Sequence, residues 1–283
     1  MNKVCIYIII LFSVSLKVSA QENNPKIDLF FSIIDNNLKK LITSVESINS
    51  RNSEEVILNI ISAKKEYDLG IEKINEKLYI EKNSNTELLF SSCSGQESDK
   101  DNNEEAAIRN MLEKYYLMMF YEEGYCYFAF NWEGYTKLIA PKLNSGQLKF
   151  IELYAVHYSK PVVSDAAIII SPKELSQRIT EWNEVLNCVS DSLLKNEARI
   201  EMYGYIELLL LGTDNTPSFK NNKLDKGVRQ SIEELIKNNP EFESVQIIKK
   251  FYTNLKKNNF KYSSKYAKEL TERLIQTSES IFR

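Results

Sequence analysis

His157 is the single histidine of this 283-residue chain, and it limits the catalytic chemistry open to the protein. A zinc site built on two or three imidazoles is excluded, and no H-E-x-x-H stretch is present. A serine or cysteine hydrolase would have to use His157 as its base, yet no G-x-S-x-G nucleophile motif accompanies it. His157 lies near the C-terminal end of an expected helix, where a histidine interacts favourably with the helix dipole. We therefore predict a structural role for this residue.

Phosphate-binding glycine loops are also missing from the sequence. Neither G-x-G-x-x-G nor G-x-x-x-x-G-K-[ST] occurs, which disfavours the familiar classes of NAD-dependent and ATP-dependent enzymes. We expect no cofactor and no bound metal.

Carboxylates are the potential catalytic groups that are numerous in the sequence, with 39 Asp and Glu residues. Glycoside cleavage needs only two acids about 5–10 Å apart, and a sequence of this kind does not select such a pair. Our main prediction is a protein without catalysis. The alternative is a carboxylate-based hydrolase or lyase acting on cell-wall glycan or peptide.

Aromatic residues concentrate between residues 115 and 135, where ten of the chain's 31 aromatic side chains lie. Tyrosine and tryptophan combine apolar area with a polar group, so this segment could form a binding surface. The aromatic positions cover all faces of the expected helices, however, which favours the packing centre of a helical domain. Within the segment, Trp132 and Tyr135 are the candidates for contact with a partner.

The C-terminal part of the chain is basic. Residues 220–283 hold 14 Lys or Arg and 8 Asp or Glu, and aromatic residues alternate with the lysines there. Such a surface would suit an acidic protein or an anionic envelope polymer, and in an exported chain we do not expect nucleic acid. A solvated helical face is the more ordinary interpretation of a charged run. The candidate partner-binding lysines are Lys249, Lys250, Lys256, Lys257 and Lys261.

The stretch from Gly212 to Pro217 is short, polar and rich in turn-forming residues. Gly212 is expected to end the preceding helix, and a loop is expected over 213–223. Asp214 and Asn215 are suited to capping the preceding helix and fixing a turn, which is the interpretation that we favour. They could equally offer a small polar recognition site, so both remain candidate partner-binding residues.

Three cysteines lie beyond the first twenty residues: Cys93, Cys126 and Cys188. No C-x-x-C is present, so neither a redox motif nor a zinc ribbon is indicated. In an oxidising compartment, Cys93 and Cys126 are candidates for one disulfide. The alternative is that all three are unpaired and that Cys126 and Cys188 are small core residues.

The first twenty residues resemble a secretory signal peptide in layout. Lys3 precedes an apolar run from Val4 to Leu16, and small residues lead to a cleavage site between Ala20 and Gln21. A membrane-spanning helix needs about 20 apolar residues, and Lys17 interrupts this run too early. We expect a periplasmic or secreted protein with no membrane span after cleavage.

Helical periodicity dominates the rest of the chain. Apolar residues recur at three- and four-residue spacing over 27–48 and over 53–80, which predicts a helical hairpin. A polar linker is expected over 83–103, and residues 161–170 suit either short strands or a buried helix. Further helices are expected over 104–123, 125–143, 145–158, 172–189, 195–211, 225–238, 240–258 and 263–280.

Two of these helices carry start signals. Ser171, Pro172 and Glu174 have the pattern of a capping box with proline in the first turn. Asn239 and Pro240 similarly suggest an N-cap followed by the first helical residue.

The sequence thus predicts an all-α protein of about nine or ten helices, arranged as an irregular bundle or an αα-hairpin solenoid. It divides into a signal peptide (1–20), an N-terminal helical hairpin (21–82), a polar linker (83–103) and a helical main domain (104–283). Because helical stacks present long surfaces and no catalytic motif is evident, we expect a scaffold, adaptor or inhibitor. Its partner would be an envelope protein or an anionic envelope polymer. A periplasmic immunity-type protein is a further alternative.

Overall fold

The computed structural model describes residues 25–47, 64–76, 102–122 and 125–279. The proposed cleavage site at Ala20 and Gln21 lies outside these residues, as do Cys93 and most of the expected linker. Within the described chain, no helix is both long and apolar enough to cross a membrane.

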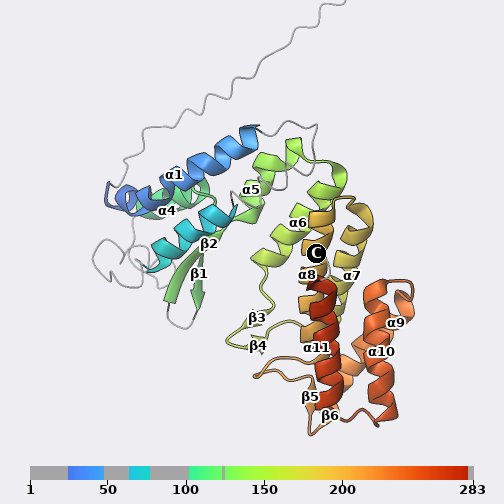
Figure 1. The fold of residues 1–283 in the computed structure, drawn as a ribbon. Helices are drawn as coiled ribbons and strands as arrows, with labels where there is room; N and C mark the ends of the chain where they lie inside the picture. The colour runs from blue at the N-terminus through green and yellow to red at the C-terminus, as the bar shows by residue number, and fades with distance from the viewer. Residues whose placement is uncertain (1–24, 48–63, 77–101, 123–124, 280–283) are drawn as a thin grey trace, which may run out of the picture.

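Two helices pack together at the N-terminal end of the described chain (Figure 1). α1 spans Pro25–Ser47, and a second helix covers residues 64–76. Asn37 donates its side-chain amide to the backbone carbonyl of Glu66 at 3.0 Å. Further along, a Cβ atom at Gly70 would lie 2.8 Å from the Ile34 side chain, so glycine permits the close approach. The order of these contacts shows that the two helices are antiparallel.

A β-hairpin follows α4 (Asn102–Lys114), where the sequence pattern predicts helix. β1 (Leu117–Glu122) pairs antiparallel with β2 (Tyr125–Phe130). The prediction of helices over 104–123 and 125–143 is therefore wrong between residues 117 and 130.

Local conformation and side-chain shape explain this difference. Tyr116 adopts a left-handed backbone with φ of 46°, which ends the helical path, and its carbonyl accepts a hydrogen bond from the Asn131 amide at 2.7 Å. Aromatic side chains favour strands, where they pair with a neighbour across the hairpin. Phe120 and Tyr127 are such direct partners, and their stacked rings lie 5.4 Å apart.

The hairpin packs on the N-terminal helices. The side chain of Asn75 accepts from the Phe128 amide at 2.7 Å and donates to the Phe128 carbonyl at 2.9 Å, so it pairs the free edge of β2. The Tyr67 and Phe130 rings meet edge to face at 5.5 Å.

Capped helices follow the hairpin. α5 (Trp132–Ile139) begins at Asn131, whose side chain accepts from the Gly134 amide, and a short 3-10 turn (Ala140–Lys142) ends it. α6 (Ser145–Ser159) begins with a reciprocal capping box between Asn144 and Gln147.

α7 (Pro172–Cys188) and α8 (Ser192–Leu210) form the central helical pair. Only half of the predicted capping box is present at α7. The Ser171 hydroxyl accepts from the Glu174 amide at 3.2 Å, but the Glu174 carboxylate lies 3.6 Å from the Arg178 guanidinium.

Two small hairpins flank α7 and α8. β3 (Val163–Ser164) pairs with β4 (Ala167–Ile168), which resolves the ambiguous segment 161–170 in favour of short strands. β5 (Phe219–Lys220) pairs with β6 (Lys223–Leu224) inside a stretch that the sequence pattern predicts as loop. Between α8 and β5, Gly212 has φ of 79° and donates to the Leu208 carbonyl, which is the C-terminal role predicted for it.

Three helices complete the chain: α9 (Lys226–Asn238), α10 (Glu243–Lys257) and α11 (Ser264–Glu279). α10 begins later than predicted. Phe242 is its N-cap residue, and the Phe242 amide donates to the Asn239 carbonyl, so Asn239 and Pro240 belong to a preceding turn.

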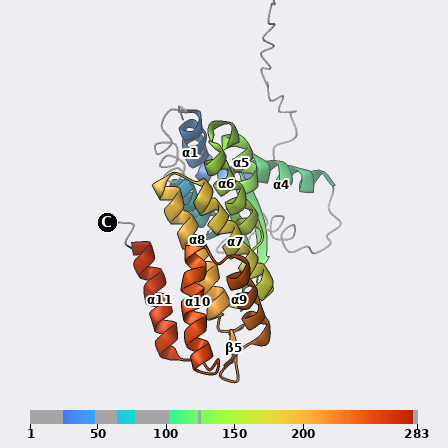
Figure 2. The same cartoon turned by 90° about the vertical axis from the view of Figure 1, so that its right-hand side faces the viewer.

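The helices stack in a row. α7 contacts α6, α8 and α9, while α10 contacts α9 and α11. Figure 1 shows the N-terminal elements at one end and α9 to α11 at the other, and Figure 2 shows the last three helices side by side. One hydrophobic cluster runs from Ile34 to Leu274. Because strands occur in the described chain only as short antiparallel pairs, the all-α prediction is confirmed.

Candidate functional site

Two cavities lie on either side of Tyr154, between the N-terminal helices, the hairpin and α6 to α8. The smaller has a volume of about 200 Å³, and the larger has a volume of about 420 Å³. Tyr154 lines both, and burial raises the pKa of its hydroxyl, with further increases from the Glu201 and Glu197 carboxylates. We call the two spaces the small cavity and the large cavity.

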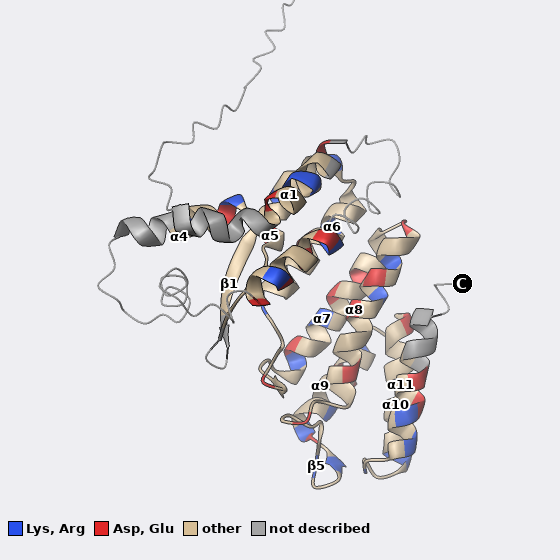
Figure 3. Ribbon diagram, turned by 60° about the vertical axis from the view of Figure 1, so that its left-hand side comes forward, with Lys and Arg blue, Asp and Glu red and all other residues tan. Residues whose placement is uncertain are grey.

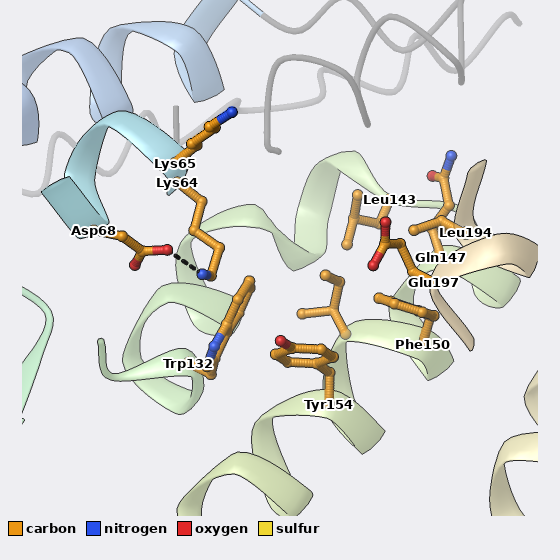
Figure 4. A pocket seen from close by; sticks show the side chains of 11 residues that line it. Lys64, Lys65, Asp68, Trp132, Leu143, Gln147, Phe150, Tyr154, Leu194 and Glu197 are labelled. Atoms are coloured by element: carbon orange, nitrogen blue, oxygen red, sulfur yellow. Dashed lines mark hydrogen bonds and ion pairs between the residues drawn. The ribbon is translucent and has the colours of Figure 1, made fainter. Parts of the chain in front are cut away.

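The small cavity joins the helix over residues 64–76 to α5, α6 and α8 (Figure 4). Its lining residues are Lys64, Lys65, Asp68, Trp132, Leu143, Gln147, Phe150, Ile151, Tyr154, Leu194 and Glu197. Local capping positions two of them, because Trp132 is the first residue of α5 and Gln147 belongs to the capping box of α6.

A lysine of the protein itself lies in the small cavity. The Lys64 ammonium lies 5.3 Å from the centre of the Trp132 ring and forms an ion pair with Asp68, which Figure 4 marks. A ring face and a carboxylate are both favourable neighbours for an ammonium group. Burial raises the pKa of Glu197, and the Lys64 ammonium partly offsets that increase.

The large cavity is aromatic and draws its walls from the hairpin, α6, α7 and α8. Its lining residues are Phe120, Tyr127, Ala129, Tyr154, His157, Tyr158, Pro161, Val162, Trp182, Glu201 and Tyr205. Among the described residues, neither lysine nor arginine lines it. The pairing of Phe120 with Tyr127 places both rings on the face of the hairpin that this cavity borders.

Each cavity receives one glutamate from α8. Glu197 and Glu201 lie one helical turn apart, so their side chains leave the same face of the helix. Burial raises the pKa of the Glu201 carboxyl, and the neighbouring Glu197 carboxylate raises it further. Burial also raises the pKa of Glu197, against the opposing effect of Lys64. Among the described residues, no hydrogen bond or ion pair satisfies either carboxylate.

His157 and Arg178 support the wall of the large cavity. The His157 Nε2 atom lies 2.9 Å from a Glu181 carboxylate oxygen, and the ring lies edge-on to Trp182 and Tyr205. Burial lowers the pKa of His157 despite the hydrogen bond to Glu181. Arg178, itself buried, donates to the Lys160 carbonyl at 2.9 Å and to the Tyr205 hydroxyl at 3.4 Å.

The arrangement of Glu197 and Glu201 differs from that of the paired acids of a glycoside hydrolase. A glycoside hydrolase places its two carboxyl groups on opposite sides of the scissile bond. Glu197 and Glu201 instead extend from one helix into separate cavities. Over the described ranges, no group of three His, Cys, Asp or Glu side chains is arranged to hold a metal ion.

The predicted aromatic candidates have different environments. Trp132 lines the small cavity, whereas Tyr135 is 0% exposed and lines neither cavity. Tyr135 packs against Phe130 and Trp132 in the core, where a partner does not reach it. The burial of Tyr115, Phe128 and Phe130 agrees with the packing interpretation of this segment, although a hairpin rather than helices provides it.

The predicted basic residues lie on other elements. They lie on α10 or just after it, and none lines either cavity. Figure 3 shows α10 away from α1 and α5. The predicted basic residues are Lys249, Lys250, Lys256, Lys257 and Lys261, and their side chains are exposed. On the neighbouring helix α11, two other lysines form ion pairs with glutamates of the same helix.

The predicted polar loop has a structural contact. Asn215 donates its side-chain amide to the Asp165 carbonyl at 2.6 Å, and its backbone amide donates to the Ala166 carbonyl at 3.2 Å. Thr216 accepts from the Ile168 amide through its hydroxyl at 3.1 Å. Asp214 is exposed beside them. These bonds join the loop to the turn between β3 and β4, and within the described chain none of them caps α8, which is the role predicted for Asp214 and Asn215.

The cysteines divide into one bonded and one free residue. Cys126 in β2 is disulfide-bonded, and Cys188 at the end of α7 is an exposed free thiol. The expectation that Cys126 lies in a helix is wrong, and so is the alternative that all three cysteines are unpaired. Of the two residues which that alternative places in the core, Cys126 is buried there and Cys188 is exposed. The pairing of Cys126 with Cys93 stays a prediction.

Sequence reasoning missed the residues that define the cavities, above all Glu197 and Glu201. A signal was present in α8, where Leu194, Glu197, Glu201 and Tyr205 recur at three- and four-residue spacing. Two glutamates therefore lie on the inner face of a helix, where a charged residue is uncommon. No comparable sequence pattern predicts that Lys64 and Asp68 line the small cavity, because their position there depends on how helices distant in the sequence pack together.

Comparisons with known proteins do not assign the chain to a family. No family model matches it, and neither a curated protein nor a solved structure does so.

Proposed function

We propose that this protein is a binding protein, without catalysis, that holds part of a partner macromolecule in the two cavities beside Tyr154. The observation that carries the proposal is the pair of half-buried glutamates, Glu197 and Glu201, set among aromatic rings. A carboxylate without a partner in a partly apolar site is unfavourable unless a ligand compensates it. Aromatic rings beside such a charge are typical of the centre of a recognition site.

The sign of the charge helps to choose the partner. Among the described residues that line the large cavity, Glu201 is the acidic one, and neither lysine nor arginine is present, so the cavity disfavours an anionic polymer. An envelope protein presenting basic and apolar side chains fits the site better. The lysines of α10 lie elsewhere and would not contribute to this contact.

Export remains part of the proposal. We infer that the signal-like segment is removed after Ala20 and that the chain works in the periplasm or outside the cell. The disulfide at Cys126 supports this inference, because disulfides persist mainly in oxidising compartments.

Site-specific photo-cross-linking in the native host tests the binding function. A photoreactive amino acid replaces Tyr158, which is 39% exposed and lines the large cavity, or, as a matched control, Tyr262, which is 46% exposed and lines neither cavity. We expect a covalent adduct of discrete mass from position 158 and none from position 262. Equal labelling at both positions, or no adduct at either, would contradict the proposal.

One observation favours a second candidate, acid-catalysed cleavage of a glycan. The raised pKa of Glu201 is the property that a general acid needs near neutral pH. If the protein is such an enzyme, purified cell-wall glycan is cleaved by the native chain and left intact by a Glu201→Gln variant that still folds. If it is a binding protein, neither chain releases any fragment.

A further inference from the structure

The small cavity shows how this protein accommodates a positive charge. The Lys64 ammonium lies over the face of Trp132, forms an ion pair with Asp68, and acts on the Glu197 carboxyl. An aromatic face and a carboxylate together replace much of the hydration that an ammonium loses on burial. A buried lysine can in general pack its alkyl stem along apolar surface while its ammonium keeps polar partners.

One helical turn along α8, the large cavity also combines a carboxylate with aromatic rings, but its described lining has no counterpart of Asp68 and neither lysine nor arginine. Glu201 takes the place of Glu197, and the Tyr154 ring borders both spaces. Phe120, Tyr127 and Tyr158 supply further rings around an open volume of about 420 Å³. The nearest buried guanidinium, Arg178, bonds to the Tyr205 hydroxyl and the Lys160 carbonyl, and it is not among the lining residues.

Charge and shape together restrict what this space accepts. An anion would meet the Glu201 carboxylate, and the basic residue on the described lining is His157, whose pKa is lowered by burial. A purely apolar group would fill the rings but leave Glu201 desolvated and without a partner. A cation on an apolar stem satisfies the carboxylate and the rings at once.

We propose that the large cavity binds the primary ammonium group and alkyl stem of a lysine side chain from a partner polypeptide, in the way that the small cavity holds Lys64. The ammonium contacts Glu201, and the stem lies among Phe120, Tyr127 and Tyr158. This inference rests on the proposed binding function, and it names the chemical group that the site recognises.

The two tryptophans of the chain make the test specific, because each reports on one cavity. Trp182 lines the large cavity and Trp132 lines the small one. The probes are four tripeptides, acetyl-Ala-X-Ala-amide, in which X is lysine, norleucine, arginine or glutamate. Blocked ends leave the central side chain as the only variable charge. Each is titrated into ¹⁵N-labelled protein while the two indole N–H signals are followed by NMR.

We expect the lysine peptide to shift the Trp182 signal with saturation below about 10 mM, since a single side chain gives weak affinity. The norleucine peptide should bind about tenfold more weakly or worse, because it lacks the charge. The glutamate peptide should produce no shift. Glu201→Gln should weaken the lysine peptide by about tenfold, and Glu197→Gln, the matched control on the same helix face, by less than about threefold.

Several results would overturn the assignment. They are equal binding of the lysine and norleucine peptides, tighter binding of the arginine peptide, a shift confined to Trp132, or no shift from any peptide. Unchanged indole positions in the unbound variants verify that both still fold. If position 158 still cross-links while the lysine peptide fails, the ligand class is wrong and the binding function stands. If both fail, the binding function is wrong as well.

Discussion

Asn215 donates its side-chain amide to the backbone carbonyl of Asp165 at 2.6 Å, across fifty positions of sequence. Asp165 and Ala166 form the turn between β3 and β4, and both have positive φ, at 46° and 53°. The loop after α8, which contains Asn215, therefore stabilises the turn between β3 and β4, whose left-handed backbone is unfavourable for Asp165 and Ala166. This contact fixes the loop that leads from α6 to α7, the two helices that supply Tyr154, His157 and Trp182.

Asn215→Ala should lower the free energy of unfolding by about 1 kcal/mol, because it removes the hydrogen bond to the Asp165 carbonyl. Asp214→Ala is the matched control, since Asp214 is exposed and no hydrogen bond is found for it within the described chain. Its effect should stay within about 0.5 kcal/mol. Urea denaturation followed by tryptophan fluorescence measures both. Equal effects of the two substitutions would show that the contact does not stabilise the fold.

Ala166→Gly should have the opposite sign and raise the free energy of unfolding. Glycine adopts φ of 53° without the penalty that a Cβ atom brings, which is about 1–2 kcal/mol for an L-residue in the left-handed region. The gain is reduced by about 0.4–1 kcal/mol, because glycine has more freedom in the unfolded chain. The same urea experiment measures the net change, with Ala167→Gly in β4 as a control that should be destabilising. A loss of stability at position 166 would contradict the turn geometry.

The helices were predictable because their signals are local. Apolar spacing located α6 to α9 to within a few residues, and Gly212 ended α8 as expected. The β1–β2 hairpin was not predictable in this way, since a run of aromatic residues satisfies helical spacing as well as a strand does. Its conformation depends on the left-handed Tyr116 and on the backbone pairing of Asn75 with Phe128, which no periodicity encodes.

The candidate site depended still more on tertiary contacts. The spacing of Glu197 and Glu201 was visible in α8, but their environments require the hairpin and the helix over 64–76. Trp132 and Tyr135 were both selected as candidates for contact with a partner, but both are buried, at 5% and 0% exposed, and only Trp132 lines a cavity among those described. Nothing in the local sequence distinguishes these two residues, because the distinction arises from which distant helix covers each face.

His157 should titrate below pH 6.5, the ordinary pKa of a histidine side chain, because burial beside Trp182 and Tyr205 lowers its pKa. Glu181 and Glu174 oppose this shift, and Arg178 adds to it. The unfolded chain then binds more protons than the folded chain, so stability is lost as the pH falls below 6.5 through the folded pKa. An untagged protein has a single histidine, so one imidazole signal in an NMR pH titration gives the answer. A midpoint above 6.5 would contradict the burial argument.

The disulfide at Cys126 leads to a prediction about thiols. If Cys93 is its partner and the segment up to Ala20 is removed, the secreted chain has one free thiol, Cys188. Mass spectrometry of a non-reduced digest should find the peptide of Cys126 linked to that of Cys93, and alkylation before reduction should label Cys188. A second free thiol in the purified native protein would contradict cleavage or pairing. A linked peptide that contains Cys188 would contradict the structure.

Glu201→Gln should stabilise the ligand-free protein at neutral pH. Burial and the Glu197 carboxylate raise the folded pKa of Glu201 above its ordinary value of 4.5, so the folded chain holds a proton that the unfolded chain has lost. Wild-type stability therefore falls as the pH rises from 4.5 through the folded pKa, and the uncharged variant escapes this loss.

The difference in the free energy of unfolding between the Glu201→Gln variant and the wild type should therefore be small below pH 4.5. It should grow as the pH rises from 4.5 through the folded pKa of Glu201, and then level off. Urea denaturation at a series of pH values measures this difference. Glu207→Gln, an exposed glutamate of the same helix, is the control and should show no comparable trend. If the two variants follow the same curve, Glu201 is solvated like a surface residue. The large cavity would then lack the desolvated carboxylate on which recognition of an ammonium group depends, because a fully hydrated pair contributes little to binding.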